Sequence, residues 1–310
     1  MKTPMTTPKW NFSIYLLAIL PPLFWAGNFV LGKWAVTTIP PVQLSFFRWL
    51  IALFILSGIT YKTLKDHYKT IIKNIKKIFI FSLLGIVGFN IFIYIALQKT
   101  TAINGALINS TMPIVTLLLS IFIIKESFQF KQYIGITASF FGLLVLFSSG
   151  DLSVFLKLNF NQGDIFILLG VACWSLYTIL VKKWVIELPF FVFLFSIVFI
   201  GCLLHIPLLF IEASYTGWAN FSYPTLTAII YLAIFPSILA YFFWGKVVTS
   251  IGPAKASLFM YLTPIFSTIF ALIFLKEKIH VHHLVGFIFV VIGIVLVNKV
   301  HKKNGTIEIS

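Results

Sequence analysis

Charged side chains are scarce in this chain of 310 residues, and acidic ones are the scarcest. Asp, Glu, Lys and Arg together make up 10% of the sequence, whereas a soluble domain carries about 25%. Apolar residues make up 60%, and the mean hydropathy is +1.03. This composition excludes a soluble globular domain and indicates an all-α membrane protein that crosses the bilayer several times.

Cysteine is also rare. The two cysteines, Cys173 and Cys202, lie in apolar runs and resemble small hydrophobic residues more than a disulfide, so they indicate no redox compartment. Lys and Arg number 23 against 8 Asp and Glu, which gives a net charge of +15. Because the lysines fall in short loops between apolar runs, they indicate membrane orientation, and no nucleic-acid partner is expected.

Ten apolar stretches approach the roughly 20 residues that a helix needs to cross about 30 Å of hydrocarbon. With the N-terminus in the cytoplasm, most Lys and Arg residues lie on the inner side, which predicts a plasma (inner) membrane protein with both termini cytoplasmic. The lysine-rich stretch KTLKDHYKTIIKNIKK is expected to be a solvated or headgroup-bound amphipathic segment. The expected spans lie near 14–36, 41–60, 78–98, 102–123, 133–149, 164–182, 189–211, 225–247, 254–275 and 284–299.

The two halves of the chain repeat each other. The stretch WAGNFVLGK begins at Trp25 and ends at Lys33, and its counterpart WSLYTILVK runs from Trp174 to Lys182. This predicts a duplicated five-helix unit, with repeats at 1–150 and 151–310. Five is odd, so the second copy would be inverted in the membrane, as in many transporters. Five further residues recur at a spacing of 151: Pro113, Lys125, Glu126, Gly135 and Gly142 match Pro264, Lys276, Glu277, Gly286 and Gly293.

Pro113 and Pro264 are expected to kink their helices. At 1.5 Å per residue, each proline lies roughly 15–17 Å into its span, near the middle of the membrane. A proline there leaves a carbonyl without its helical donor. The kinks could serve packing alone, but their equivalent placement in both halves favours a gating role.

Three stretches resemble a known family. FWAGNFVLGKWAV in the first span, NGALINSTMPIVTLLLSIFIIKE in the fourth and SLFMYLTPIFSTIFALIFLKEKI in the ninth resemble the EamA-type drug/metabolite transporters. The resemblance covers nearly the whole chain. It implies a ten-helix inverted-repeat fold, cytoplasmic termini and the export of small metabolites.

Aromatic and polar side chains recur at mid-span with helical spacing, which puts neighbours on one face. By analogy with the family fold, six of the spans would surround a central cavity. An interhelical hydrogen bond is the alternative role for the asparagines, and an interfacial position is the alternative for the aromatic residues. The candidate substrate-binding residues are Trp25, Asn28, Asn90, Tyr94, Asn109, Ser110, Trp174, Tyr177, Tyr241, Trp244, Tyr261 and Thr263.

The charged residues near these spans suggest structural roles. Arg48 lies inside the second span, where an unpaired guanidinium is costly; a structural charge paired with helix-end carbonyls is expected. Lys33 and Lys182 are close to helix ends and are expected to reach the headgroups. His205 is the only mid-span histidine and is interpreted as a hydrogen-bonded structural residue. No metal site or cofactor is expected.

The carboxylates all lie in loops or at span ends, which argues against a proton-driven pump for lipophilic cations. An aromatic centre with asparagine and hydroxyl groups suits a small amphipathic metabolite, and an amino-acid exporter working by alternating access is the leading hypothesis. The alternatives are a nucleotide-like substrate, taken up or exchanged, and a membrane-embedded enzyme acting on lipid, although no catalytic pair of suitable spacing is present. The oligomeric state stays open, a monomer being one option.

Overall fold

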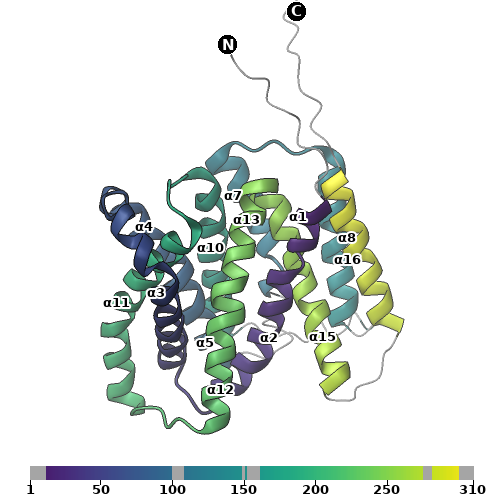
Figure 1. Ribbon diagram of the computed structural model, residues 1–310. Coiled ribbons are helices and arrows are strands. Elements are labelled where there is room, and N and C mark those ends of the chain that lie inside the picture. The colour runs from purple at the N-terminus through teal and green to yellow at the C-terminus, as the bar shows by residue number, and fades with distance from the viewer. Residues whose placement is uncertain (1–11, 100–107, 149–150, 152–160, 275–280, 300–310) are drawn as a thin grey trace, which may run out of the picture.

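The computed structural model describes residues 12–99, 108–148, 151, 161–274 and 281–299, and every structural statement below concerns these residues. Within them the chain is helical and contains no strand. The helices pack side by side in a bundle, and the start of α1 and the end of α16 lie at the same end of it (Figure 1).

The helices follow the expected apolar stretches closely. In the first half they are α1 (Phe12–Leu17), α2 (Leu20–Ala35), α3 (Pro41–Lys73), α4 (Ile75–Phe81), the π-helix η1 (Ser82–Gly88), α5 (Phe89–Lys99), α7 (Met112–Ile124) and α8 (Phe130–Phe147). In the second half they are α10 (Gln162–Lys183), α11 (Phe190–Thr216), α12 (Tyr223–Leu232), the π-helix η2 (Ala233–Leu239), α13 (Ala240–Ile251), α14 (Pro253–Ser257), the 3₁₀-helix η3 (Leu258–Tyr261), α15 (Leu262–Phe274) and α16 (Val281–Lys299).

Six helices in the described part are long and apolar enough to cross a membrane: Ser13–Ala35, Pro41–Lys73, Ile75–Lys99, Gln162–Lys183, Phe190–Thr216 and Tyr223–Ile251. Three shorter apolar helices are Met112–Ile124, Phe130–Leu146 and Leu284–Val297. The chain is therefore a multi-pass membrane protein. The expected fourth and ninth spans are partly outside the described residues, which omit 100–107 and 275–280.

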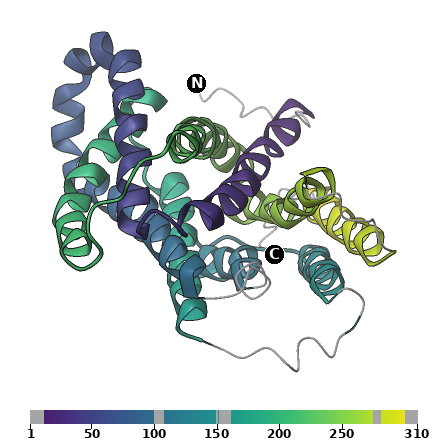
Figure 2. The ribbon, with the colours of Figure 1, turned by 90° about the horizontal axis from the view of Figure 1, so that it is seen from below.

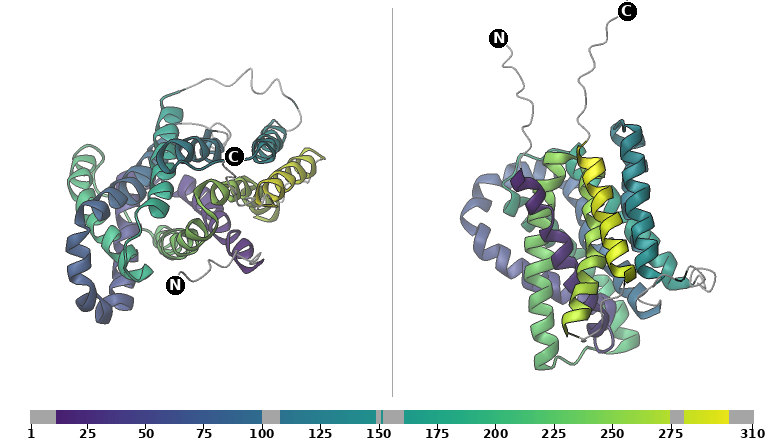
Figure 3. Two further views of the ribbon diagram at one scale, coloured as in Figure 1. Left: turned by 90° about the horizontal axis from the view of Figure 1, so that it is seen from above. Right: turned by 90° about the vertical axis from the view of Figure 1, so that its right-hand side faces the viewer.

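The lysine-rich segment is helical. Helix α3 has 33 residues, so at 1.5 Å per residue it is about 50 Å long, whereas the hydrocarbon is about 30 Å thick. Its last turns and the start of α4 therefore extend beyond the hydrocarbon, and they project from one edge of the bundle (Figure 3).

A seam of glycines joins α8 to α16, which lie together at the opposite edge of the bundle (Figure 2). A Cβ on Gly142 would lie 2.7 Å from the carbonyl oxygen of Gly286, and one on Gly135 would lie 2.7 Å from that of Gly293. The helices therefore run antiparallel, with backbones close together. Because Gly135 is equivalent to Gly286 and Gly142 to Gly293, each contact is the counterpart of the other, as a two-fold axis requires.

The two π-helices are also equivalent. η1 begins at Ser82 and η2 at Ala233, at the same spacing of 151 as the repeated residues. In η2, which contains Pro236, the Ser237 hydroxyl donates to the Leu232 carbonyl at 2.7 Å. In η1, the side-chain amide of Asn90 donates to the carbonyls of Gly85 and Ile86 at 2.9 and 3.0 Å.

The prolines at 113 and 264 differ from the expectation. Pro113 lies in the first two positions of α7, directly after the Ser110–Thr111 turn, rather than inside a continuous helix. Pro264 lies in the first turn of α15, which follows η3 with no non-helical residue between them. Only Pro113 therefore starts a new helix after a turn, a position in which the missing N–H costs little.

We predict that Gly142→Ala destabilises the protein by about 1–3 kcal/mol, because its Cβ would press on the Gly286 backbone. Gly58→Ala, in α3, is the matched control, since a Cβ there meets nothing within 4 Å. The control should be neutral or stabilising by about 0.5–1 kcal/mol through helix propensity. Thermal unfolding of both variants in detergent measures the difference, and equal melting temperatures would contradict the seam.

Candidate functional site

Five of the candidate aromatic residues meet in the middle of the bundle, and we call them the aromatic cluster. Trp25 of α2 packs edge-on against its repeat equivalent, Trp174 of α10, with ring centroids 5.0 Å apart. Tyr177 stacks on Trp174 at 5.1 Å, Tyr241 lies 5.2 Å from Trp174, and Trp244 lies 5.4 Å from Trp25. Each such pair contributes about 0.5–1.5 kcal/mol beyond its burial. The cluster joins both halves of the chain.

A polar cluster of Arg48, Asn28 and Tyr94 adjoins these rings. The Nη1 group of Arg48 donates to the Oδ1 of Asn28 at 2.9 Å and to the hydroxyl oxygen of Tyr94. The Tyr94 hydroxyl in turn donates to Asn28 Oδ1 at 2.9 Å. The Arg48 side chain is 1% exposed. Arg48 thus joins α2, α3 and α5, and the expected pairing with helix-end carbonyls is not what the structure has.

Trp49 links the two clusters, and sequence reasoning missed it. Its ring centroid lies 5.0 Å from the guanidinium carbon of Arg48 and 5.2 Å from the ring of Tyr241. Tyr94 presents a second ring to the guanidinium at 5.7 Å. A cation over aromatic faces gains about 0.5–2 kcal/mol per ring. The one signal in the sequence was the position of Trp49 directly after the buried arginine.

Equivalent carbonyls of the two π-helices accept hydrogen bonds from the aromatic cluster. The indole Nε1 of Trp25 donates to Pro236 at 3.1 Å, and the Tyr241 hydroxyl donates to Gly85, which Asn90 also bonds. The amide nitrogen of Asn90, a candidate for substrate contact, is thus bonded to backbone. These bonds hold the rings against the two π-helices. Such helices are rare in proteins overall, and those that occur are often found at functional sites.

The candidates before α7 and around η3 are buried but form a separate group. Asn109, Ser110, Tyr261 and Thr263 are each at most 7% exposed. The Asn109 Oδ1, the Tyr261 hydroxyl and the Thr263 hydroxyl have no hydrogen-bond partner within the described part of the chain. Tyr261 takes no part in the ring contacts of the aromatic cluster. Ring contacts and hydrogen bonds therefore join eight of the twelve candidates at the centre of the described bundle.

The two repeated lysines cap helix ends. The Nζ of Lys33 donates to the Leu97 carbonyl in the last turn of α5. The Nζ of Lys182 donates to the Thr249 carbonyl in the last turn of α13, at 2.8 Å. A cation at a helix C-terminus satisfies a carbonyl and favours the helix dipole. The repeat thus preserves a cap in each half.

His205 has the structural role that its sequence position suggested. Its Nδ1 lies 2.7 Å from the Gly201 carbonyl, and its Nε2 lies 2.9 Å from the Ser45 hydroxyl. A carbonyl can only accept, so Nδ1 carries the proton and Nε2 accepts from serine. No group of three or more metal-ligating side chains is found among the residues described.

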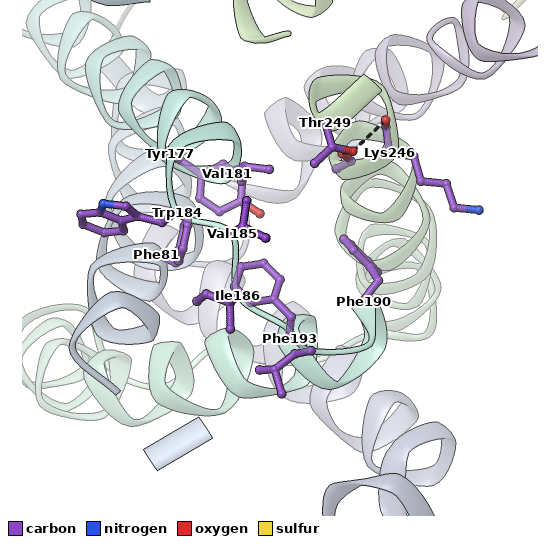
Figure 4. Close-up of a pocket in the computed structure, with 12 residues that line it drawn as sticks. Phe81, Tyr177, Val181, Trp184, Val185, Ile186, Phe190, Phe193, Lys246 and Thr249 are labelled. Atoms are coloured by element: carbon purple, nitrogen blue, oxygen red, sulfur yellow. Dashed lines mark hydrogen bonds between the residues drawn. The ribbon is translucent and has the colours of Figure 1, made fainter. Parts of the chain in front are cut away.

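A cavity of about 270 Å³ lies beside the aromatic cluster (Figure 4). It reaches the cluster at Tyr177 and extends to Thr249 near the end of α13. The side chain of Lys246 points away from it. Its walls are mainly apolar and aromatic, and the sequence gave no sign of it. The other lining residues include Phe81, Val181, Trp184, Ile186, Phe190 and Phe193.

A bundle of apolar helices around a buried aromatic and polar centre is the architecture of a multi-pass membrane transporter. The chain belongs to the EamA-like transporter family, whose sequence model matches residues 12–148 and again 161–299. The resemblance inferred from the motifs is thereby confirmed.

Relatives from bacteria and archaea agree with the family. The uncharacterized transporter YyaM of Bacillus subtilis is 27% identical over 291 residues, which cover 94% of this chain and 95% of the relative. An uncharacterized transporter of Archaeoglobus fulgidus is also 27% identical, over 92% of this chain and 97% of its own length. A solved structure at 16% identity superposes with a TM-score of 0.71 over 92% of this chain and 96% of that chain, so it shares the fold.

We predict that Trp25→Phe destabilises the protein more than Trp174→Phe does. Both changes shrink a buried indole, but only Trp25 loses a hydrogen bond, because Trp174 Nε1 has no partner among the described residues. Leaving the Pro236 carbonyl without its donor should cost a further 1–3 kcal/mol, roughly. Chemical unfolding of the purified variants measures the gap. Equal losses would mean that the bond to Pro236 is not formed.

Proposed function

We propose that the protein exports small amphipathic metabolites, amino acids first among them, across the plasma (inner) membrane by alternating access. One observation carries the proposal. Trp25 and Trp174, equivalent residues of two halves, pack against each other at 5.0 Å beside the buried charge of Arg48. A site at the interface of two repeats is the usual place for a transporter's substrate.

The chemistry of the centre supports an amphipathic substrate. Ring faces bind an apolar body and a substrate ammonium, at about 0.5–2 kcal/mol for each cation–ring contact. None of the described carboxylates belongs to the aromatic or polar cluster: Asp66 is exposed on α3, and Asp164 and Glu212 cap α10 and α3. The centre therefore has no fixed negative charge to favour a hydrophobic dication.

The architecture that we propose has ten membrane spans in two inverted five-helix repeats, at 1–150 and 151–310. The antiparallel glycine seam between α8 and α16 and the matching π-helices support the inversion. The common end of the bundle at which α1 begins and α16 ends supports cytoplasmic positions for both termini (Figure 1).

Transport requires the aromatic cluster to open, because its rings are almost completely buried against one another. Trp174, Tyr177, Tyr241 and Trp244 are each at most 2% exposed. We propose that the helices move at the two π-helices, at the turn before Pro113 and at η3 before Pro264. These are the points at which regular helical hydrogen bonding is already interrupted.

We predict that amino acids compete for transport in proteoliposomes and that Asn28→Ala and Trp174→Ala each lower apparent affinity several-fold. Both changes remove contacts of the central site. Trp218→Ala is the matched control, since Trp218 is 56% exposed and lies outside the cluster. A competition screen with amino acids, nucleosides, sugars and organic cations measures the effect. Competition by sugars or cations alone would overturn the proposed substrate class.

We predict that a cysteine at position 215 reacts with an impermeant maleimide from outside the cell and one at position 73 only from inside. Tyr215 is 86% exposed and Lys73 is exposed, and the proposed topology puts them on opposite sides. The background variant lacks Cys173 and Cys202. Labelling of both positions from the same side would be incompatible with the topology.

A further inference from the structure

We infer that Arg48 is the carboxylate-binding residue of the central site, so that the transported molecule has to carry a carboxylate. The inference rests on the proposed function, and it gives Arg48 a role in specificity instead of a purely structural one. The geometry of its guanidinium points to this role.

The hydrogen bonds of Arg48 use only one end of the guanidinium. Nη1 bonds to Asn28 and Tyr94, whereas Nε has no acceptor and no bond from Nη2 is formed to any described residue. Nε–H and the neighbouring Nη2–H point in the same direction and match the two oxygens of a carboxylate. We call this pair the side-on edge. It is the edge that a purely structural arginine would be expected to use.

No carboxylate neutralises Arg48 within the part of the chain that the structure describes. Its partners are the neutral groups of Asn28 and Tyr94 and the faces of Trp49 and Tyr94. A buried cation held only by neutral groups is costly, and removing that cost requires an anion with good geometry. A substrate carboxylate on the side-on edge supplies both the charge and the missing acceptors.

The surroundings of Arg48 place the rest of such a substrate. Trp49 contacts both the guanidinium and Tyr241, and Tyr241 contacts Trp25 and Trp174. A molecule whose carboxylate lies on Arg48 therefore has its apolar body directed toward the aromatic cluster once that cluster opens. This combination selects amino acids and aryl or alkyl monocarboxylates over uncharged sugars and over amines that lack an acid.

The test compares acids with their amides by tryptophan fluorescence of the purified full-length protein in detergent. The probe pairs are L-phenylalanine with L-phenylalaninamide and 3-phenylpropionate with 3-phenylpropionamide. Two charge-assisted hydrogen bonds should make wild-type protein prefer each acid by about 10–100-fold. Arg48→Gln should abolish the preference, and Arg48→Lys should keep part of it, because the charge remains while the two-pronged geometry is lost.

Two further variants separate this role from a structural one. Lys73→Gln is the matched control for Arg48→Gln, because it removes an exposed cation outside the central site, so the acid preference should persist. Asn28→Asp puts a carboxylate on Nη1 and neutralises the guanidinium, so the preference should disappear in a protein that keeps Arg48 and Tyr94. This variant decides the question if Arg48→Gln does not fold.

The inference is overturned if wild type binds neither acid, if it binds acid and amide equally, or if Arg48→Gln or Asn28→Asp retains the wild-type preference. The assay does not depend on transport. If wild-type protein binds the acids, Arg48→Gln does not, and wild-type protein fails to transport amino acids, only the proposed function is contradicted. Transport without an acid preference would contradict the inference alone.

Discussion

Hydrocarbon supplies no hydrogen bonds, so each polar group inside this bundle needs a partner from the protein itself. The irregular parts of the structure depend on that constraint. In η2 the Ser237 hydroxyl donates to the Leu232 carbonyl, and the carbonyls of Gly85 and Pro236 accept from side chains of the centre. Lys33 and Lys182 satisfy carbonyls at helix ends in the same way.

The duplication provides a symmetric frame around an asymmetric centre. The glycine seam, the π-helices and the lysine caps occur in equivalent pairs. The central tryptophans are equivalent in sequence, yet Trp25 donates to a carbonyl whereas Trp174 Nε1 has no partner in the described structure. Arg48 belongs to the first half only, since residues 197–199 of the second half are apolar. Under the proposed function, this asymmetry would give the substrate one preferred orientation.

The packed aromatic cluster sets an energetic limit on the transport cycle. Its ring contacts, each contributing about 0.5–1.5 kcal/mol, have to be broken before a substrate can enter. A substrate with an apolar body restores comparable contacts, whereas a small polar solute does not. Under the proposed function, selectivity would depend on the contacts that the protein's own side chains give up, in addition to those that they make with the substrate.

The amino-acid pattern was sufficient for the membrane class, for the family and for eight residues that meet at the centre, but it did not indicate Trp49. Composition and run length are enough to identify apolar helices, and eight of the candidate residues meet because helical spacing puts them on facing surfaces. The repeat also identified the glycines, although not the contact that they make.

Only the tertiary structure decided how those residues are bonded. The two π-helices, SLLGIVG and AIFPSIL, have no identical residue at any equivalent position, so the matching of identical residues between the halves did not find them. The partners of Arg48, the caps made by Lys33 and Lys182, and the place of Trp49 join residues that are far apart in the chain. A hydrogen bond requires its atoms within about 3 Å, and separation along the sequence does not specify that distance.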